Sequence, residues 1–202
     1  MTITQGASAR LDAVNALVQI QMSYASRGSS LAAAALAGSR EFVEWKHYPR
    51  GDFVDSENRS EFYYHAHAEK ERAAGEHGHF HVFTRLESGG FVHLVGISLD
   101  DRGHATRLFT TNRWVTGEAW APASEMEPLV RNFAVRGRGR LAPVARWIEA
   151  LVCLYADTII ELIRERDVCL PNESALDNRS VHIVNMRGLD LLKDIADSLN
   201  NQ

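Results

Sequence analysis

The segment between residues 41 and 111 alternates short runs of aromatic and β-branched residues with turn-forming residues, and this pattern limits the possible folds most strongly. Such residues fit the pleated surface of a sheet, and their side chains alternate between its two faces. The pattern predicts strands at about 41–48, 61–68, 77–86, 91–99 and 105–111. The turn-forming residues between them lie at 49–52, 69–76, 88–90 and 100–103. Because these connections are too short for parallel crossovers, we expect one antiparallel sheet of about five strands.

Helical patterns flank the predicted sheet on both sides. Apolar residues spaced three and four apart predict an amphipathic helix at about 7–22, and Ser29 and Ser30 offer an N-cap for a second helix at 31–37. Beyond the sheet, helices are predicted at about 122–135, 143–166 and 189–199. Pro128 is expected to lie in the first turn of its helix or to break it, and residues 181–184 fit either strand or coil. The expected class is α+β, with N-terminal helices and a long C-terminal helix around the sheet.

Length and composition fit one domain over residues 1–202, with helices at 1–38, the sheet at 41–120 and a helical part at 121–202. The net charge of −4 provides no global positive field for nucleic acid. The chain starts without a basic segment and apolar run, and its apolar stretch at 31–37 is too short to span a membrane. We therefore expect a cytoplasmic protein with a small-molecule substrate, whose oligomeric state is left open. Cys153 and Cys169 are expected to be buried thiols.

Five of the nine histidines lie within seventeen residues, in two clusters. The clusters are His65 with His67, and His77 with His79 and His81. In a strand, residues two apart share a face and lie roughly 6.5 to 7 Å apart, so two imidazoles can lean onto one ion. If the two strands pair directly, three or four imidazoles converge.

Imidazole suits iron, zinc, copper and nickel, whereas magnesium and calcium prefer oxygen ligands. The sequence thus predicts one divalent transition metal, with His65, His67, His79 and His81 as principal ligands and His77 in reserve. An open coordination position would take a small organic substrate. Iron could activate dioxygen there, and zinc could activate water for hydrolysis. The first hypothesis is therefore a metal-dependent enzyme.

Other side chains are candidates for supporting roles. Glu76 and Glu61 are the first candidates for catalytic carboxylates and, like Asp52, could also complete or orient the ligand set. Tyr63 and Arg85 share the predicted histidine face and are candidates for substrate contact.

Three further histidines and a run of arginines have less specific predicted roles. His47 is a candidate to reach the site from a neighbouring strand, while His93 and His104 are expected at the surface or in the core. The run of arginines at 136–140 could bind an anion or form a basic connector. By parity, Phe62, Tyr64, Phe80 and Val82 are expected to face the helices.

The motif HGHFHVF at 77–83 resembles the histidine triad of nucleotide hydrolases and transferases. In that family three alternating histidines bind phosphate and the middle one is the nucleophile, so the resemblance implies attack by His79 without a required metal. The match covers seven residues, and Gly78 stands where the family favours an apolar side chain. It leaves His65 and His67 without a role.

A wider pattern resembles a bacterial family described as a domain of unknown function. It comprises WKHYPRGD at 45–52, YYHAH at 63–67 and EHGHFH at 76–81, within residues 41–99. The resemblance implies a bacterial cytosolic protein and carries no activity with it. A third hypothesis is therefore a non-catalytic protein that binds a metal or a partner.

Overall fold

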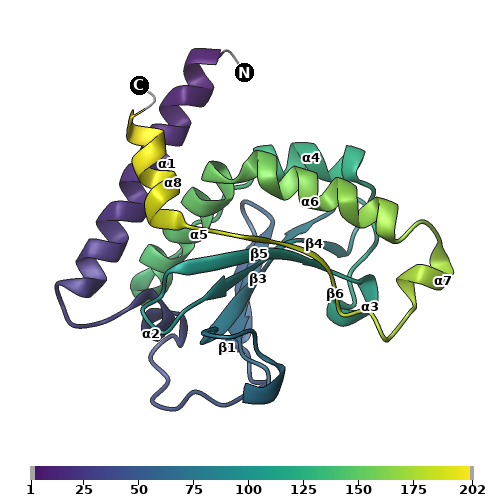
Figure 1. Cartoon of the computed structure of the whole chain (residues 1–202), viewed down its shortest axis with the longest axis horizontal. Helices are drawn as coiled ribbons and strands as arrows, with labels where there is room; N and C mark the ends of the chain where they lie inside the picture. The colour runs from purple at the N-terminus through teal and green to yellow at the C-terminus, as the bar shows by residue number, and fades with distance from the viewer. Residues whose placement is uncertain (1–2, 201–202) are drawn as a thin grey trace.

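The fold is a six-stranded antiparallel sheet with helices packed against one face, as a computed structural model of residues 3–200 shows (Figure 1). The strand order in the sheet follows the chain order. The strands are β1 (Tyr48–Asp55), β2 (Ser60–His65), β3 (Gly78–Arg85), β4 (Phe91–Leu99), β5 (Ala105–Thr111) and β6 (Ile183–Gly188). The predicted α+β class is confirmed. The stretch that fitted either strand or coil leads into β6, which adds a sixth strand at the edge beside β5.

Helices occupy both ends of the chain. They are α1 (Ile3–Ala25), α2 (Leu31–Ala35), α3 (Arg113–Thr116), α4 (Ala123–Arg131), α5 (Ala142–Leu154), α6 (Ala156–Cys169), α7 (Glu173–Leu176) and α8 (Leu191–Asn200), with 3-10 turns η1 (Glu69–Glu71) and η2 (Gly139–Leu141). The Ser30 hydroxyl accepts a hydrogen bond from the Ala33 N–H at 3.1 Å, which confirms the predicted cap. Within residues 3–200, no helix has the length and apolar character needed to cross a membrane.

Two helix predictions were wrong in detail. The single helix at 143–166 is divided into α5 and α6 at Tyr155, whose backbone leaves helical geometry with φ −105° and ψ 21°. The apolar period runs through this break, so it gave no sign of the interruption. Pro128 lies in the interior of α4, which continues only to Arg131. The proline lacks an N–H for the helix ladder, and the helix ends within one turn of it.

The first strand prediction was also wrong. Residues 41–47 form a connection, and β1 instead includes the predicted turn at 49–52. The register with β2 shifts between Tyr48 and Phe53, and Gly51 and Asp52 adopt positive φ angles of 82° and 58°. The turn-forming residues therefore make a bulge in an edge strand, where proline and an irregular ladder are tolerated.

The hydrophobic core lies between the sheet and the helices. Phe62, Tyr64, Phe80 and Val82 are buried in it, as parity predicted. Trp147 of α5 is fully buried, with its ring centroid 6.2 Å from that of Phe80. Cys153 and Cys169 are exposed, so the prediction of buried thiols was wrong: both lie on helix faces turned away from the core. Because the core uses one face of the sheet, the histidines are left on the other.

Replacing Trp147 with alanine should lower the free energy of unfolding by about 3–5 kcal/mol, because it removes the largest fully buried side chain. Val168→Ala is the control, since Val168 on α6 is 79% exposed and its loss should change stability by less than about 0.5 kcal/mol. Urea unfolding followed by circular dichroism measures both. Equal midpoints for the two variants would contradict this account of the core.

Candidate metal centre

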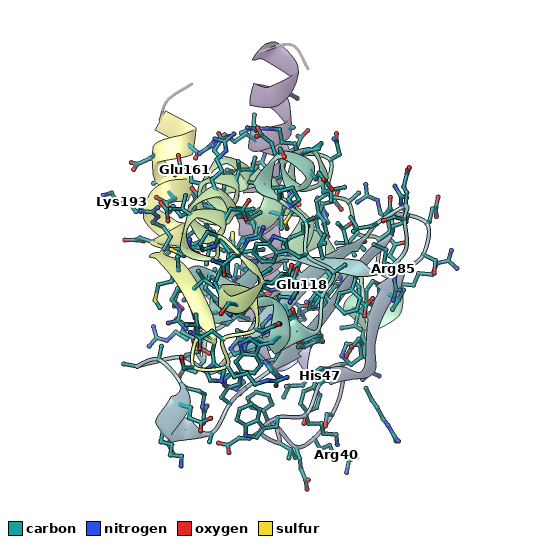
Figure 2. The ribbon with its side chains drawn as sticks, turned by 90° about the vertical axis from the view of Figure 1, so that its right-hand side faces the viewer. Arg40, His47, Arg85, Glu118, Glu161 and Lys193 are labelled. Carbon is teal, nitrogen blue, oxygen red and sulfur yellow. The ribbon has the colours of Figure 1, made fainter. Side chains whose placement is uncertain are left out.

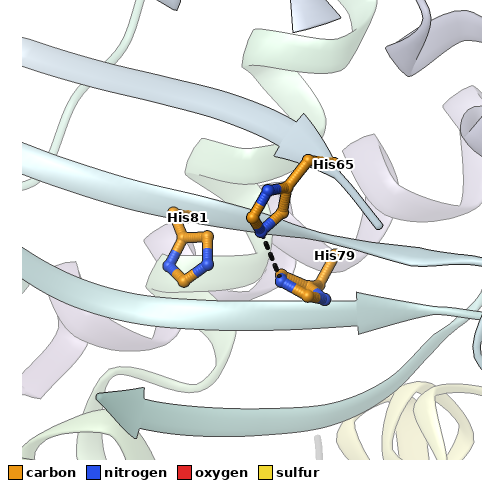
Figure 3. A group of neighbouring side chains, drawn as sticks. All are labelled: His65, His79 and His81. Carbon is orange, nitrogen blue, oxygen red and sulfur yellow. Dashed lines mark hydrogen bonds between the residues drawn. The ribbon is translucent and has the colours of Figure 1, made fainter. Parts of the chain in front are cut away.

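His65, His79 and His81 form a buried cluster on the face of the sheet opposite the core (Figure 3). Each residue offers one ring nitrogen as a ligand atom, and these three atoms all lie within 4.8 Å of one another. The Nε2 atoms of His65 and His79 are only 2.8 Å apart. These three histidines could therefore hold a metal ion.

Strand register brings the cluster together. β2 and β3 are antiparallel neighbours in which His65 lies directly opposite His79, and Tyr63 lies opposite His81. Residues on one face of paired strands are close enough for their side chains to touch. The expectation that the two histidine-bearing strands pair directly is thus confirmed.

Glu76 fixes the orientation of His79. Its Oε1 accepts a hydrogen bond from the Nδ1–H of His79 at 2.7 Å, and its Oε2 accepts one from Arg107 at 2.7 Å. With the proton on Nδ1, the Nε2 atom of His79 presents a lone pair toward His65. A carboxylate that holds the far nitrogen of a histidine is the usual support for a metal ligand.

Burial keeps two imidazoles of the cluster, those of His65 and His81, neutral. The pKa of His65 is lowered well below its usual value, first by burial and then by the neighbouring His79 and His67. The pKa of His81 is also lowered well below its usual value, first by burial and then by His93. Neutral imidazole is the form that binds a metal, so these rings need not lose a proton first.

His67 lies at the edge of the cluster and His77 lies outside it. The ring centroid of His67 is 5.1 Å from those of His65 and His79. His77 instead stacks on Phe42 at 4.6 Å and shares a hydrogen bond of 2.8 Å with the hydroxyl of Tyr64, a core residue. The prediction that His77 shares a face with His79 and His81 was wrong, because β3 begins at Gly78 and His77 is free of its alternation.

The remaining candidates have different positions around the site. Glu61 and Tyr63 line the pocket beside the cluster, but Arg85 lies outside the lining and forms an ion pair with Glu61 at 2.6 Å. His47 reaches the site, as expected of a neighbouring segment: its ring stacks on Tyr63 at 3.7 Å. Its Nδ1 is 2.9 Å from Asp52 Oδ1.

Three residues near the cluster were not expected there. The Nε2 of His93 is 3.0 Å from Nδ1 of His81, and a bulge between β3 and β4 turns His93 toward it. Gly96 leaves room for Phe109, whose ring would lie 2.1 Å from a Cβ at that position. The Phe109 ring meets His79 edge-on at 5.3 Å. A glycine inside a strand often marks the close approach of a neighbouring group. Gly96 was therefore the feature of the sequence that could have indicated the position of Phe109.

The cluster opens onto a pocket of about 770 Å³. Strands β2 to β5 form its floor, and α3 and the segment before β6 contribute to its wall. Aromatic side chains are prominent in its lining: Trp45, Tyr63, Phe83, Phe91, Phe109 and Trp114. The volume is typical of a small-molecule site.

A second buried carboxyl group lies behind the cluster. Glu118 accepts a hydrogen bond from the backbone N–H of His93 at 2.6 Å. Burial raises its pKa to about 7, and the hydrogen bond from His93 and the attraction to Arg166 oppose this only in part. Figure 2 shows Glu118 in the interior and Glu161 at the surface.

The family described as "Domain of unknown function (DUF6969)" matches residues 11–196. The match runs from α1 to α8 and extends well beyond residues 41–99, where the motifs lie. It confirms the resemblance to a domain of unknown function. No curated protein and no solved structure matches the chain.

Glu118→Gln should make the protein lose less of its folding stability as the pH rises. A carboxyl whose pKa is raised on folding from about 4.3 to about 7 favours the native state below pH 4 and loses about 3 kcal/mol of that advantage as pH rises through 7. Because glutamine cannot ionise, the stability of the variant relative to the native protein should increase between pH 5 and pH 8. Chemical unfolding of metal-free protein measures this, with exposed Glu161→Gln as the control. Parallel pH profiles for the Glu118 variant and the native protein would refute it.

Proposed function

Because the chain belongs to the DUF6969 family, a domain of unknown function, we propose its activity from the site alone: it is a metal-dependent enzyme that acts on a small organic substrate. His65, His79 and His81 would hold one divalent transition metal, with iron, zinc, copper and nickel suited to imidazole. The observation that carries the proposal is the convergence of three buried imidazoles beside an open pocket.

The spacing of the His65 and His79 rings would fit an ion after a small adjustment, and the His81 ligand atom lies within 4.8 Å of theirs. Bonds from zinc to histidine are about 2.0–2.1 Å, so two ligands of a tetrahedral site lie about 3.3 Å apart. The Nε2 atoms of His65 and His79 are 2.8 Å apart, and they would separate by about 0.5 Å to admit the ion. Small rotations about the side-chain bonds of both residues would produce this separation.

Supporting residues prepare the ligands for binding. Glu76 holds the Nδ1 proton of His79, and its bond to Arg107 leaves it poorly placed to act as a free base. We therefore assign Glu76 a positioning role. For His81, a proton on Nδ1 donated to Nε2 of His93 would leave Nε2 for the ion. Glu61, on the pocket wall, is paired with Arg85 at 2.6 Å, so it too is poorly placed to act as a free base.

A pocket beside the ligands favours catalysis over storage. Three protein ligands leave a coordination position open, which is the catalytic pattern, whereas a storage site would be closed by further protein ligands. Iron in this site would activate dioxygen, and zinc would activate water. The histidine-triad alternative is weakened because His77 packs toward Tyr64 and the core, so three alternating histidines do not share a face.

Protein purified without a histidine tag should contain close to one equivalent of transition metal by elemental mass spectrometry. His65→Ala and His79→Ala should each lose most of it, because each removes one of three ligands. His104→Ala is the control, since His104 pairs with Asp100 at the turn between β4 and β5. Metal far below one equivalent, or unaffected by both ligand variants, would overturn the proposal.

Glu76→Gln should weaken metal binding by about 10- to 100-fold, because the carboxylate that orients His79 is lost. Competition with a chromophoric chelator measures the dissociation constant, and circular dichroism checks the fold. Glu61→Gln is the matched control: it removes a carboxylate from the same pocket without touching a proposed ligand. Equal affinities for the two variants would contradict the positioning role of Glu76.

A further inference from the structure

Trp45 occupies an unusual position at the edge of the pocket. It is 57% exposed, and its backbone has a φ of 66°, a region that side chains other than glycine rarely adopt. Its backbone N–H donates a hydrogen bond to the Ala66 carbonyl at 2.8 Å, and its indole ring stacks on the His67 ring with the centroids 4.3 Å apart. A large aromatic ring is therefore held in a strained conformation beside the metal cluster while more than half of its surface stays exposed. Such strain is found where function requires it.

The pocket interior continues this aromatic surface. Tyr63 and Phe83 pack with ring centroids 5.6 Å apart, and Phe83 meets Phe91 edge-on at 5.4 Å. Aromatic walls favour a ligand that can stack or meet them edge-on.

Most charged groups of the lining are turned toward one another or toward other protein groups. Arg107 binds Glu76, and Arg72 is directed at the His77 carbonyl at 3.3 Å. Asp52 is paired with His47, and Glu61 with Arg85. Arg107 thus faces a protein acceptor, and Arg72 faces protein acceptors with both Nη atoms, while its buried Nε has no hydrogen-bond partner among the described residues. An anionic substrate would gain little from them and would meet the wall's carboxylates.

From these contacts we propose that the substrate is an uncharged aromatic molecule that stacks on Trp45 and reaches the ion through an oxygen or nitrogen donor. The inference rests on the proposed metal site. It assigns Trp45 as the residue that selects the aromatic ring, while His65, His79 and His81 hold the ion. The strained loop before β1 is the element that sets this selectivity.

Two hydroxamates with the same metal-binding group provide the test. Benzohydroxamate carries a phenyl ring where acetohydroxamate carries a methyl group, and both are largely uncharged at neutral pH. Calorimetric titration of zinc-loaded protein should show benzohydroxamate binding about 10- to 30-fold more tightly, because it buries the additional ring surface. A 4-carboxy derivative should bind more weakly than benzohydroxamate because it adds an anion.

Variants of the Trp45 loop decide whether this residue is responsible. Trp45→Ala should reduce the ratio of the two affinities to less than about threefold, and Trp45→Phe should retain most of it. Val43→Ala is the matched control, because Val43 is 46% exposed two residues away. Since the ratio compares two ligands on one protein, partial unfolding would change both affinities together and leave it unaltered.

The possible results distinguish failure of the aromatic-substrate proposal from failure of the proposed metal site. A ratio near one in the native protein, tighter binding of the carboxy derivative, or an unchanged ratio in Trp45→Ala would overturn the aromatic substrate while metal-dependent binding persists. If neither hydroxamate binds zinc-loaded protein more tightly than metal-free protein, the metal site itself fails. Loss of the ratio in Val43→Ala as well would overturn the assignment to Trp45.

Discussion

The pairing of β2 with β3 is the constraint on which the site depends. In this register His65 lies opposite His79, and His81 follows two residues along the same strand. A slip of one residue would send one set of histidines into the core face. The slip is opposed by Phe62, Tyr64, Phe80 and Val82, which would have to leave the core at the same time. Burial of apolar side chains on one face therefore holds the imidazoles in place on the other.

The two faces of the sheet bury different kinds of side chain. Against the helices, apolar side chains are buried and need no partners. On the histidine face, polar rings are buried and require them, so His79 is bound to Glu76, and His81 to His93. Arg107 satisfies the second oxygen of Glu76. This network holds the imidazoles in the orientation in which they could receive an ion.

Family membership and geometry contribute different information about this protein. The DUF6969 match extends over most of the helices and strands and establishes the family, but no activity comes with it. The chemistry is inferred from the three converging imidazoles and the pocket beside them. The aromatic lining then limits the kind of molecule that the pocket would accept, since most of its charged groups are already turned toward protein partners.

The sequence by itself determined the α+β class, the antiparallel sheet and the two histidine clusters, because these follow from local periodicity and short turns. It could not determine where alternation stops: His77 lies just before β3, and residues 49–52 form a bulge where a turn was predicted. Nor could it show that α5 and α6 are separate, since the apolar period continues across Tyr155. Only the tertiary structure brought in Glu118, His93, Phe109 and Arg107, because contacts between distant residues depend on strand register and bulges rather than on neighbouring sequence.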